Sequence, residues 1–393
     1  MGKKPRVCII RQYYFPKEAH LRRDVNALIE GGFEVDVICA RDKGERLYER
    51  WNEVDIYRIP VIHLRKGILR YMYEYLYFFV RATLLVTKLF FKKRYDCIEV
   101  DTLPDFLVFC TIIPKLFNTR IILYLFENMP LLFSDKYNVP NRHPLIIFLR
   151  MIELLSVKFA DQVIITHARC EKCFENSVII LNVPDEMMFL PVREKNNDKT
   201  PAHSDIYNAK EVVKIVTHST LTEIYGIQNI IKAVALLKDR YTKIRCEIIG
   251  EGEYKWELMS LVRLLHLDGY VQFKGYVAFE EMSGFLKDAD IGIVSVLSDY
   301  LLPNKLFEYI ALKIPVICSS VKAIKDFFND DALFFYTPHD YRKLAKQIEW
   351  VMFHYDIALD KAKKAYMIYQ EYSWSKLKNI YISCHHPLAR RQL

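Results

Sequence analysis

The sequence lacks a long uninterrupted apolar run. A helix that crosses a bilayer needs about 18 or more consecutive apolar residues, and Arg81 and Lys88 interrupt the best candidate in this chain of 393 residues. The opening residues MGKKPRVCII carry positive charge, but their apolar run is too short for a signal peptide. We therefore expect a soluble or peripherally attached protein.

The nine cysteines lack the regular spacing of a disulfide framework. Such cysteines are expected to be free thiols in a reducing cytoplasm. Only Cys170 and Cys173 form a C-x-x-C pair, near His167, and no second close pair completes the four ligands of a zinc site. No other metal cluster of Asp, Glu and His is evident, so we predict a protein without a metal.

A dinucleotide-binding fingerprint is also incomplete. Gly250 and Gly252 follow an apolar run, but a third glycine is missing, as is an acidic residue at a strand end about 20 residues later. No recognised nucleic-acid-binding module accompanies the basic residues. We predict neither a cofactor nor a nucleic acid partner.

The chain is long enough for two α/β domains. Residues 7–10 and 35–39 are predicted strands on either side of a helix that ends near Glu30, which makes a βαβ unit and starts a parallel sheet. The same alternation begins again at Val212. Residues 131–160 predict the polar loop SDKYNVPNRHP and then an apolar helix, and the polar stretch 194–210 predicts an exposed linker.

The segment LLPNKLFEYIALKIPVI, residues 301–317, contains the strongest candidate site. Lys305 and Glu308 lie three residues apart, so a helix places them on one face. Pro303 suits a first helical turn. Asn304 and Lys305 would then lie at the positive helix end, where free backbone N–H groups favour an anion. A surface helix with an ordinary ion pair is the alternative.

PNKLFEYIA followed by PVI resembles the nucleotide-sugar signature of retaining family 4 glycosyltransferases, which have the GT-B fold. The resemblance implies two Rossmann-like parallel-sheet domains that face each other across a cleft, with the acceptor in the first and the donor in the second. It also implies that Lys305 approaches the diphosphate of the donor and that Glu308 holds its ribose or sugar. Leaving-group stabilisation by Lys305 and the helix N-terminus, without a metal, is the mechanism consistent with this sequence.

Further donor-binding residues are predicted in three loops of the second domain. Glycines allow a backbone to pass close to a nucleotide. In relatives an arginine and a lysine also bind the diphosphate, whereas Thr220 and Tyr225 occupy those positions here. The predicted donor-binding residues are His218, Ser219, Thr220, Gly250, Gly252, Gly275, Pro303 and Asn304.

The acceptor side is predicted at the strand ends of the first domain. The segment AHLRRDVNALIEGGFEVDVI resembles the opening βαβ unit of the family, and on this side we select His20, Arg22 and Asp101. Another strand runs into Glu127 and Asn128, which we predict to contact the sugar or acceptor in catalysis.

The family's strand at this point ends in His–Glu, with a proline three residues further on. Glu127 and Pro130 match that spacing, and Phe126 occupies the histidine position. In relatives that histidine lies against the transferred sugar.

Residues 61–95 carry a net charge of +7 and nine interleaved aromatic residues. A basic, aromatic-rich helix suits an anionic membrane surface. A helix that simply covers the sheet, with its charges in water, and a nucleic acid site are the alternatives. The favoured interpretation places the protein in the cytoplasm, peripherally on the inner face of the cell membrane, with a lipid-linked or glycan acceptor.

The complete prediction is a retaining, metal-independent hexosyltransferase in cell-surface polysaccharide biosynthesis. Its predicted domains are residues 1–190, a linker 191–211, residues 212–372 and a C-terminal helix 373–393. YSWSKLKNIY resembles the terminal helix that returns to the first domain in GT-B proteins. An inactive GT-B binding or partner subunit and a nucleotide-sugar epimerase are the alternative functions.

Overall fold

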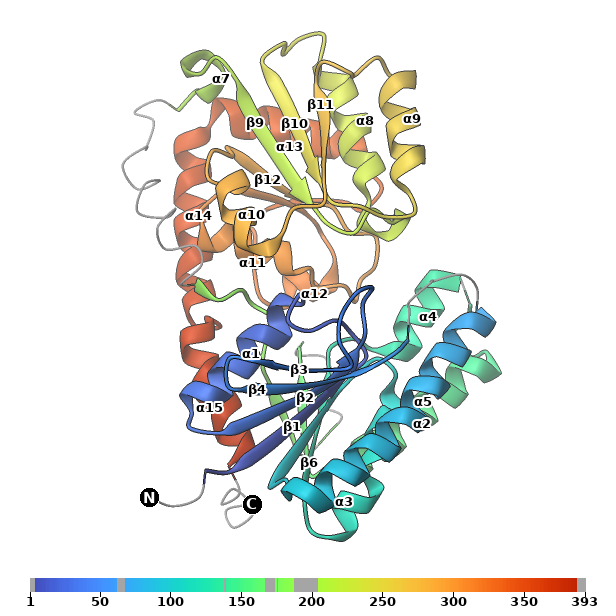
Figure 1. Cartoon of the computed structure of the whole chain (residues 1–393). Coiled ribbons are helices and arrows are strands. Elements are labelled where there is room, and N and C mark those ends of the chain that lie inside the picture. The colour runs from blue at the N-terminus through green and yellow to red at the C-terminus, as the bar shows by residue number, and fades with distance from the viewer. Residues whose placement is uncertain are drawn as a thin grey trace. The chain divides into compact units, whose positions relative to one another are not determined.

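The computed structural model describes residues 4–61, 68–137, 139–166, 174, 176–186 and 204–386. The chain divides into two compact units, each built around its own sheet (Figure 1). Unit 1 comprises Met1–Asn182 and Ser375–Leu393, and unit 2 comprises Val183–Trp374. Two α/β units with parallel sheets confirm the predicted fold class.

Unit 1 contains an eight-stranded sheet. Its strands are β1 (Arg6–Arg11), β2 (Glu34–Ala40), β3 (Tyr48–Trp51), β4 (Val54–Ile59), β5 (Cys97–Asp101), β6 (Arg120–Leu125), β7 (Gln162–Ile165) and β8 (Ser177–Ile179). Their order in the sheet is β3-β4-β2-β1-β5-β6-β7-β8, and all pairs are parallel except β3 with β4. The first two predicted strands are therefore confirmed.

Helices cover both faces of this sheet. They are α1 (Ala19–Glu30), α2 (Ile68–Lys93), the 3-10 helix η1 (Asp105–Thr111), α3 (Ile112–Leu116), α4 (Met129–Tyr137), α5 (Pro144–Phe159) and α15 (Trp374–His385). Side chains alternate along β5. Ile98 and Val100 belong to the core shared with α2, η1 and α5, whereas Glu99 lies on the other face, against Tyr381 and His385 of α15.

The predicted loop after β6 is wrong at its start, because α4 continues through Tyr137. Asn128 explains this helix: its side-chain Oδ1 accepts the Leu131 N–H at 2.9 Å, which satisfies an otherwise unpaired donor of the first turn. The segment after β5 begins with the 3-10 helix η1, whose N-cap is Pro104.

Unit 2 contains a six-stranded, entirely parallel sheet in the order β11-β10-β9-β12-β13-β14. These strands are β9 (Val213–His218), β10 (Ile244–Ile249), β11 (Val271–Gly275), β12 (Ile291–Val294), β13 (Val316–Ser319) and β14 (Phe334–Tyr336). Its helices are α7 (Ile206–Ala209), η4 (Glu223–Tyr225), α8 (Ile227–Leu237), α9 (Lys255–Leu264), α10 (Phe279–Leu286), α11 (Asn304–Ala311), α12 (Lys322–Lys325), α13 (Tyr341–Phe353) and α14 (Tyr355–Gln370).

Several predictions fall on residues outside the described ranges. These are the C-x-x-C pair Cys170 and Cys173 with His167, most of the linker 191–211, and residues 62–67 of the basic segment. The cysteines that the structure describes are free and buried. None of the helices in the described ranges combines the length and apolar character that crossing a bilayer requires.

Candidate functional site

The loops that follow β9 and β10 pack against each other at the carboxyl edge of the unit 2 sheet. A Cβ atom at Gly250 would lie 1.9 Å from the Ser219 carbonyl oxygen, and one at Gly252 would lie 2.3 Å from that of Leu221. The Gly250 N–H also donates to the Gly275 carbonyl oxygen at 2.7 Å. Glycine is therefore required at 250 and 252 for the loops themselves, and contact with a nucleotide remains a prediction.

Helix α11 lies at this edge and begins directly after Pro303, which is its N-cap rather than part of its first turn. Every residue from Lys305 to Ala311 is buried, including the lysine and Glu308, which are 3% and 5% exposed. The alternative of a surface helix with a solvated ion pair is therefore wrong. Charged groups buried this deeply need partners or a ligand.

Tyr309 reaches across the sheet from α11 because Gly292 on β12 has no side chain. A Cβ atom at Gly292 would lie 2.6 Å from the Tyr309 ring. The ring passes over this gap to the next strand, β9, where its hydroxyl accepts the His218 backbone N–H at 3.1 Å. The same hydroxyl lies 3.0 Å from Nδ1 of the His218 ring.

A neutral His218 that carries its proton on Nε2 would fit this arrangement and orient Glu308. Oε2 of Glu308 lies 2.9 Å from Nε2 of His218, and only a protonated Nε2 gives this buried oxygen a hydrogen-bond donor among the described residues. The Tyr309 hydroxyl then donates its own proton to Nδ1. His218 at the end of β9, which Tyr309 of α11 contacts in turn, thus holds Glu308 in one orientation.

Lys305 has no such anionic partner within ion-pair distance in the described part of the chain. Its Nζ lies 3.4 Å from Oγ1 of Thr217 and 5.4 Å from the centre of the Tyr225 ring. Burial lowers the Lys305 pKa to about 7, and Glu308 opposes this shift. A buried ammonium that has no carboxylate within ion-pair distance among the described residues, beside a helix N-terminus, is a site for an anion.

The remaining predicted donor residues border this position. Ser219 is half-buried, and its buried Oγ has no hydrogen-bond partner in the described residues. Thr220 is exposed, Pro303 is buried and Asn304 is half-buried. Their contact with a donor stays a prediction.

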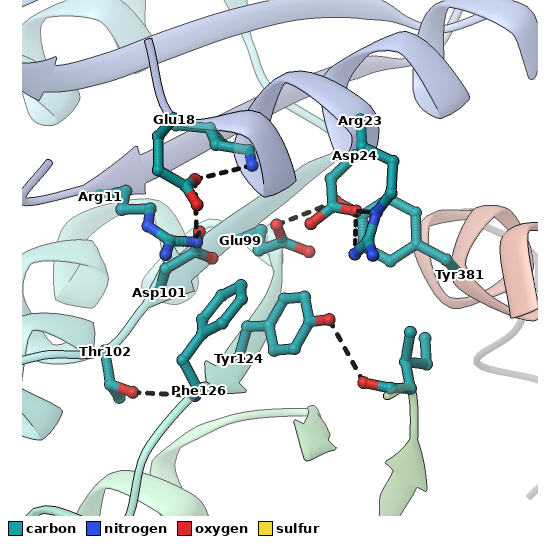
Figure 2. Close-up of polar contacts among 12 residues, drawn as sticks. Arg11, Glu18, Arg23, Asp24, Glu99, Asp101, Thr102, Tyr124, Phe126 and Tyr381 are labelled. Atoms are coloured by element: carbon teal, nitrogen blue, oxygen red, sulfur yellow. Dashed lines mark hydrogen bonds and ion pairs between the residues drawn. The ribbon is translucent and has the colours of Figure 1, made fainter. Parts of the chain in front are cut away.

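The carboxyl edge of the unit 1 sheet carries a different cluster (Figure 2). Arg11 ends β1 in register with Asp101 at the end of β5, so its Nη1 lies 3.3 Å from Oδ2 of Asp101. The same nitrogen lies 3.6 Å from Oε2 of Glu18, the N-cap of α1. The guanidinium also covers the ring of Phe126, 3.9 Å from its centre.

The charges in this cluster compensate one another. Burial alone would lower the pKa of Arg11, but Glu18 and Asp101 raise it above its ordinary value. Burial raises the pKa of Glu18, but Arg11, His20, the Leu21 N–H and Arg23 together bring it below its ordinary value. Asp101 is fully buried, so burial and the neighbouring Glu99 raise its pKa well above the ordinary value.

The structure disperses the other residues predicted on the acceptor side. Glu127 is exposed, whereas Asn128 uses its Oδ1 to cap α4 and donates its Nδ2–H to Glu153 at 2.9 Å. His20 and Arg22 are half-buried on the first turn of α1. Asp101 is fully buried and paired with Arg11, and its contact with an acceptor stays a prediction.

Sequence analysis missed Tyr309 and Arg11, although both left a signal. An isolated glycine inside a strand, such as Gly292, indicates the close approach of another group, and Tyr309 follows Glu308 directly. Arg11 ends the first buried strand, where parallel sheets collect ligand-binding residues. The missing information was which neighbouring strand each side chain would meet.

Residues 213–353 match the family model described as glycosyl transferases group 1. That segment contains β9, the three glycine loops and α11. This segment of the chain is similar to the group 1 glycosyl transferases. Two curated relatives are each 26% identical: the putative colanic acid biosynthesis glycosyltransferase WcaL of Escherichia coli over 142 residues, and the uncharacterized glycosyltransferase MJ1059 of Methanocaldococcus jannaschii over 171 residues. These matches span 35% and 42% of the chain and only 35% and 41% of the respective relatives.

Solved structures extend the similarity to the whole chain at the level of the fold. Sucrose-phosphate synthase from Thermosynechococcus elongatus aligns with a TM-score of 0.76 at 16% identity, over 98% of this chain and 100% of that one. Anabaena Alr3699/HepE, in a complex with UDP, aligns with a TM-score of 0.69 at 14% identity, over 97% of this chain and 99% of the other. The chain has the GT-B fold, which confirms the prediction from the sequence.

Proposed function

We propose that this protein transfers a sugar from a nucleotide-diphosphate sugar to a lipid-linked or glycan acceptor in cell-surface polysaccharide biosynthesis. The observation that carries the proposal is the buried Lys305 ammonium, which has no carboxylate within ion-pair distance in the described residues, at the start of α11. The match to group 1 glycosyl transferases includes this helix. The complex of Alr3699/HepE with UDP-glucose and the name of WcaL support the donor class and the pathway.

The residues of the unit 2 edge can supply most of what this reaction needs. As the bond from the sugar to the diphosphate breaks, negative charge grows on the leaving phosphate. Lys305 and the free N–H groups of α11 would stabilise that charge without a metal. Glu308, oriented by His218, would accept hydrogen bonds from hydroxyl groups of the donor and hold it in place. We propose a hexose donor and retention of anomeric configuration.

Phe126 favours one alternative, a GT-B subunit that binds a nucleotide sugar without transferring it. The family's histidine lies against the transferred sugar, whereas Phe126 is stacked on Tyr124 and covered by Arg11. An epimerase would instead convert the donor without any acceptor. Turnover therefore separates the three hypotheses.

The membrane part of the proposal concerns α2. Two residues of the predicted basic surface form ion pairs within unit 1. Arg70 pairs with Glu74, and Lys93 pairs with Asp36 and Asp55. The exposed basic residues within α2 are Arg81, Lys88 and Lys92. We propose that they attract anionic lipid headgroups on the inner face of the cell membrane.

The first experiment measures the melting temperature of the protein with UDP-, GDP-, ADP- and CMP-sugars, because a ligand of the native state stabilises it by mass action. We expect one nucleotide to raise it. The stabilising sugar is then incubated with and without membrane extract, with EDTA present, and the anomeric form of the product is determined by NMR.

Glu308→Gln keeps the shape of the side chain and removes its charge, so we expect weaker donor binding and slower transfer. Lys363→Ala, at an exposed position of α14, is the control and should behave as the wild type. No stabilisation by any nucleotide sugar would refute the donor site. Stabilisation without turnover would establish the binding subunit. Conversion of the donor in the absence of an acceptor would establish the epimerase.

A further inference from the structure

Helix α5 of unit 1 has its apolar side chains turned outward. Its acidic residue Glu153 is buried, where it accepts a hydrogen bond from Asn128. Five large apolar residues at helical spacing are between 49% and 56% exposed: Ile147, Phe148, Met151, Leu154 and Leu155. A surface helix of a globular protein normally shows the opposite pattern, so we expect this face to contact another molecule.

The apolar face continues onto α2. Met72, Leu76, Val80 and Leu84 follow one another at four-residue intervals, which places them in one row, and each is 47% to 63% exposed. The opposite side of the same helix, with Phe78, Ala82 and Val86, packs into the core. Helix α2 therefore has two apolar sides, and only one of them is covered in the described structure.

Both helices belong to one layer of unit 1. They flank η1, which contacts each of them, and Figure 1 shows α2 and α5 along the same side of the sheet. Phe117, which directly follows α3 and is also exposed, contacts Phe90 and Phe91 near the end of α2. The exposed apolar side chains of α2, α3 and α5 thus lie on helices of one layer that all contact η1, and we call them together the apolar face.

Basic side chains surround the apolar face, and both acids of its two long helices are buried. Arg81, Lys88 and Lys92 are exposed on α2, and Arg150 and Lys158 on α5. Glu74 of α2 is fully buried and paired with Arg70. Two copies of the chain joined through this face would bring like charges together. Nucleic acid would match the charge but not the apolar side chains.

We propose that unit 1 inserts the apolar face, led by α5, into a bilayer that contains anionic lipid. Apolar side chains at the centre with lysine and arginine at the border are the composition of helices that lie in a membrane interface. The inference deepens the membrane part of the proposed function and does not depend on sugar transfer. It assigns the main contact to α5, with the basic residues of α2 adding electrostatic attraction.

The test measures flotation of the full chain with vesicles of phosphatidylcholine and phosphatidylglycerol. We expect binding that largely persists in about 0.5 M NaCl, because salt screens headgroup attraction but not apolar contact. Changing Phe148, Met151 and Leu155 together to serine should lower the partition coefficient at high salt at least tenfold. The charge variant Arg81→Gln, Lys88→Gln, Lys92→Gln should lose only the additional binding seen at low salt.

A matched control and a local probe complete the design. Trp256→Ser with Leu264→Ser removes apolar side chains from α9 of unit 2, each 73% exposed, and should leave flotation unchanged. Phe148→Trp should show fluorescence quenching by brominated lipid. The proposal is overturned if the serine variant floats like the wild type, if the new tryptophan is not quenched, or if the serine substitutions abolish self-association instead of vesicle binding. Stabilisation by a nucleotide sugar, measured in parallel, shows that the serine variant is folded and tests the donor site separately.

Discussion

A largely buried cation lies at the carboxyl edge of each sheet, Arg11 at the end of β1 in unit 1 and Lys305 on α11 in unit 2, but their surroundings are opposite. Arg11 lies within 3.6 Å of two carboxylates and covers an aromatic ring. Lys305 meets a hydroxyl and an aromatic ring, while the nearby Glu308 pairs with His218 instead. Burial lowers the pKa of the lysine, whereas the carboxylates raise that of the arginine.

The difference indicates what each edge is built to do. A cation that already has its anions is electrostatically compensated in the free protein and needs no further anionic ligand. A buried cation without an anion destabilises the free protein and becomes favourable only when an anion binds. The two edges therefore predict opposite consequences when the cation is removed.

Arg11→Met should produce the largest effect on stability. The substitution leaves Glu18 and Asp101 without their cation, and breaking a buried pair in this way typically costs about 3–5 kcal/mol in free energy of unfolding. Protonation of Asp101 relieves part of this, so we expect the lower end of that range, measured by chemical denaturation. The control Arg6→Met removes a half-exposed ion pair on the same strand and should cost less than about 1 kcal/mol. Equal losses in free energy of unfolding would show that the cluster around Arg11 contributes no more to stability than the half-exposed ion pair of Arg6.

Lys305→Met should change stability in the opposite direction and weaken donor binding. Because the pKa of Lys305 is about 7 in the folded chain and 10.5 when unperturbed, the unfolded state binds more protons between these values. The wild type therefore becomes more stable as pH rises through that interval. The methionine variant should be more stable at pH 7 by at least about 1 kcal/mol.

The same variant loses a charge-assisted hydrogen bond to the diphosphate, so donor affinity should fall by about 10- to 100-fold. Calorimetric titration with the stabilising nucleotide sugar measures this effect, with Lys363→Ala as the control. A destabilised variant with unchanged donor affinity would make Lys305 a structural residue and would remove the contrast between the two edges.

The pH dependence of donor binding sharpens the comparison further. Only protonated Lys305 attracts the diphosphate, so affinity should be constant below about pH 7 and then fall by up to tenfold per pH unit, until the pKa of the bound state is reached. Lys305→Arg should flatten this profile, because a guanidinium stays charged. A flat wild-type profile would mean that the ammonium does not face the phosphates.

The sequence predicted the fold well because its signals are local. Apolar runs marked the strands, and the PNKLFEY segment identified the helix that lies at the unit 2 edge. What it could not predict depends on neighbours that are distant in the chain. The spacing placed Glu308 on one helix face with Lys305 and offered an ion pair between them only as the alternative, and the partner of Glu308 in the structure is His218, 90 residues away. The sequence predicted α5 only as an apolar helix, because composition alone does not tell which side of a helix meets the sheet.

Tyr309→Phe tests the finest part of the contrast, the claim that the unit 2 edge holds Glu308 in place for a ligand. The hydroxyl satisfies the His218 N–H and its Nδ1, so its removal should cost about 1 kcal/mol in free energy of unfolding. Freed from this bond, the imidazole can take either tautomer, and Glu308 then loses its fixed donor part of the time. We expect the KM for the donor to rise a few-fold while kcat changes less, because the phosphate contact through Lys305 is retained.

Nitrogen NMR of the His218 ring should show a single Nε2–H tautomer in the wild type and a mixture in the variant. The substitution should have little further effect on KM when His218 is already alanine, since two residues that act through one bond are not additive. An undiminished effect in that background would mean that Tyr309 acts on the donor directly and not by positioning Glu308.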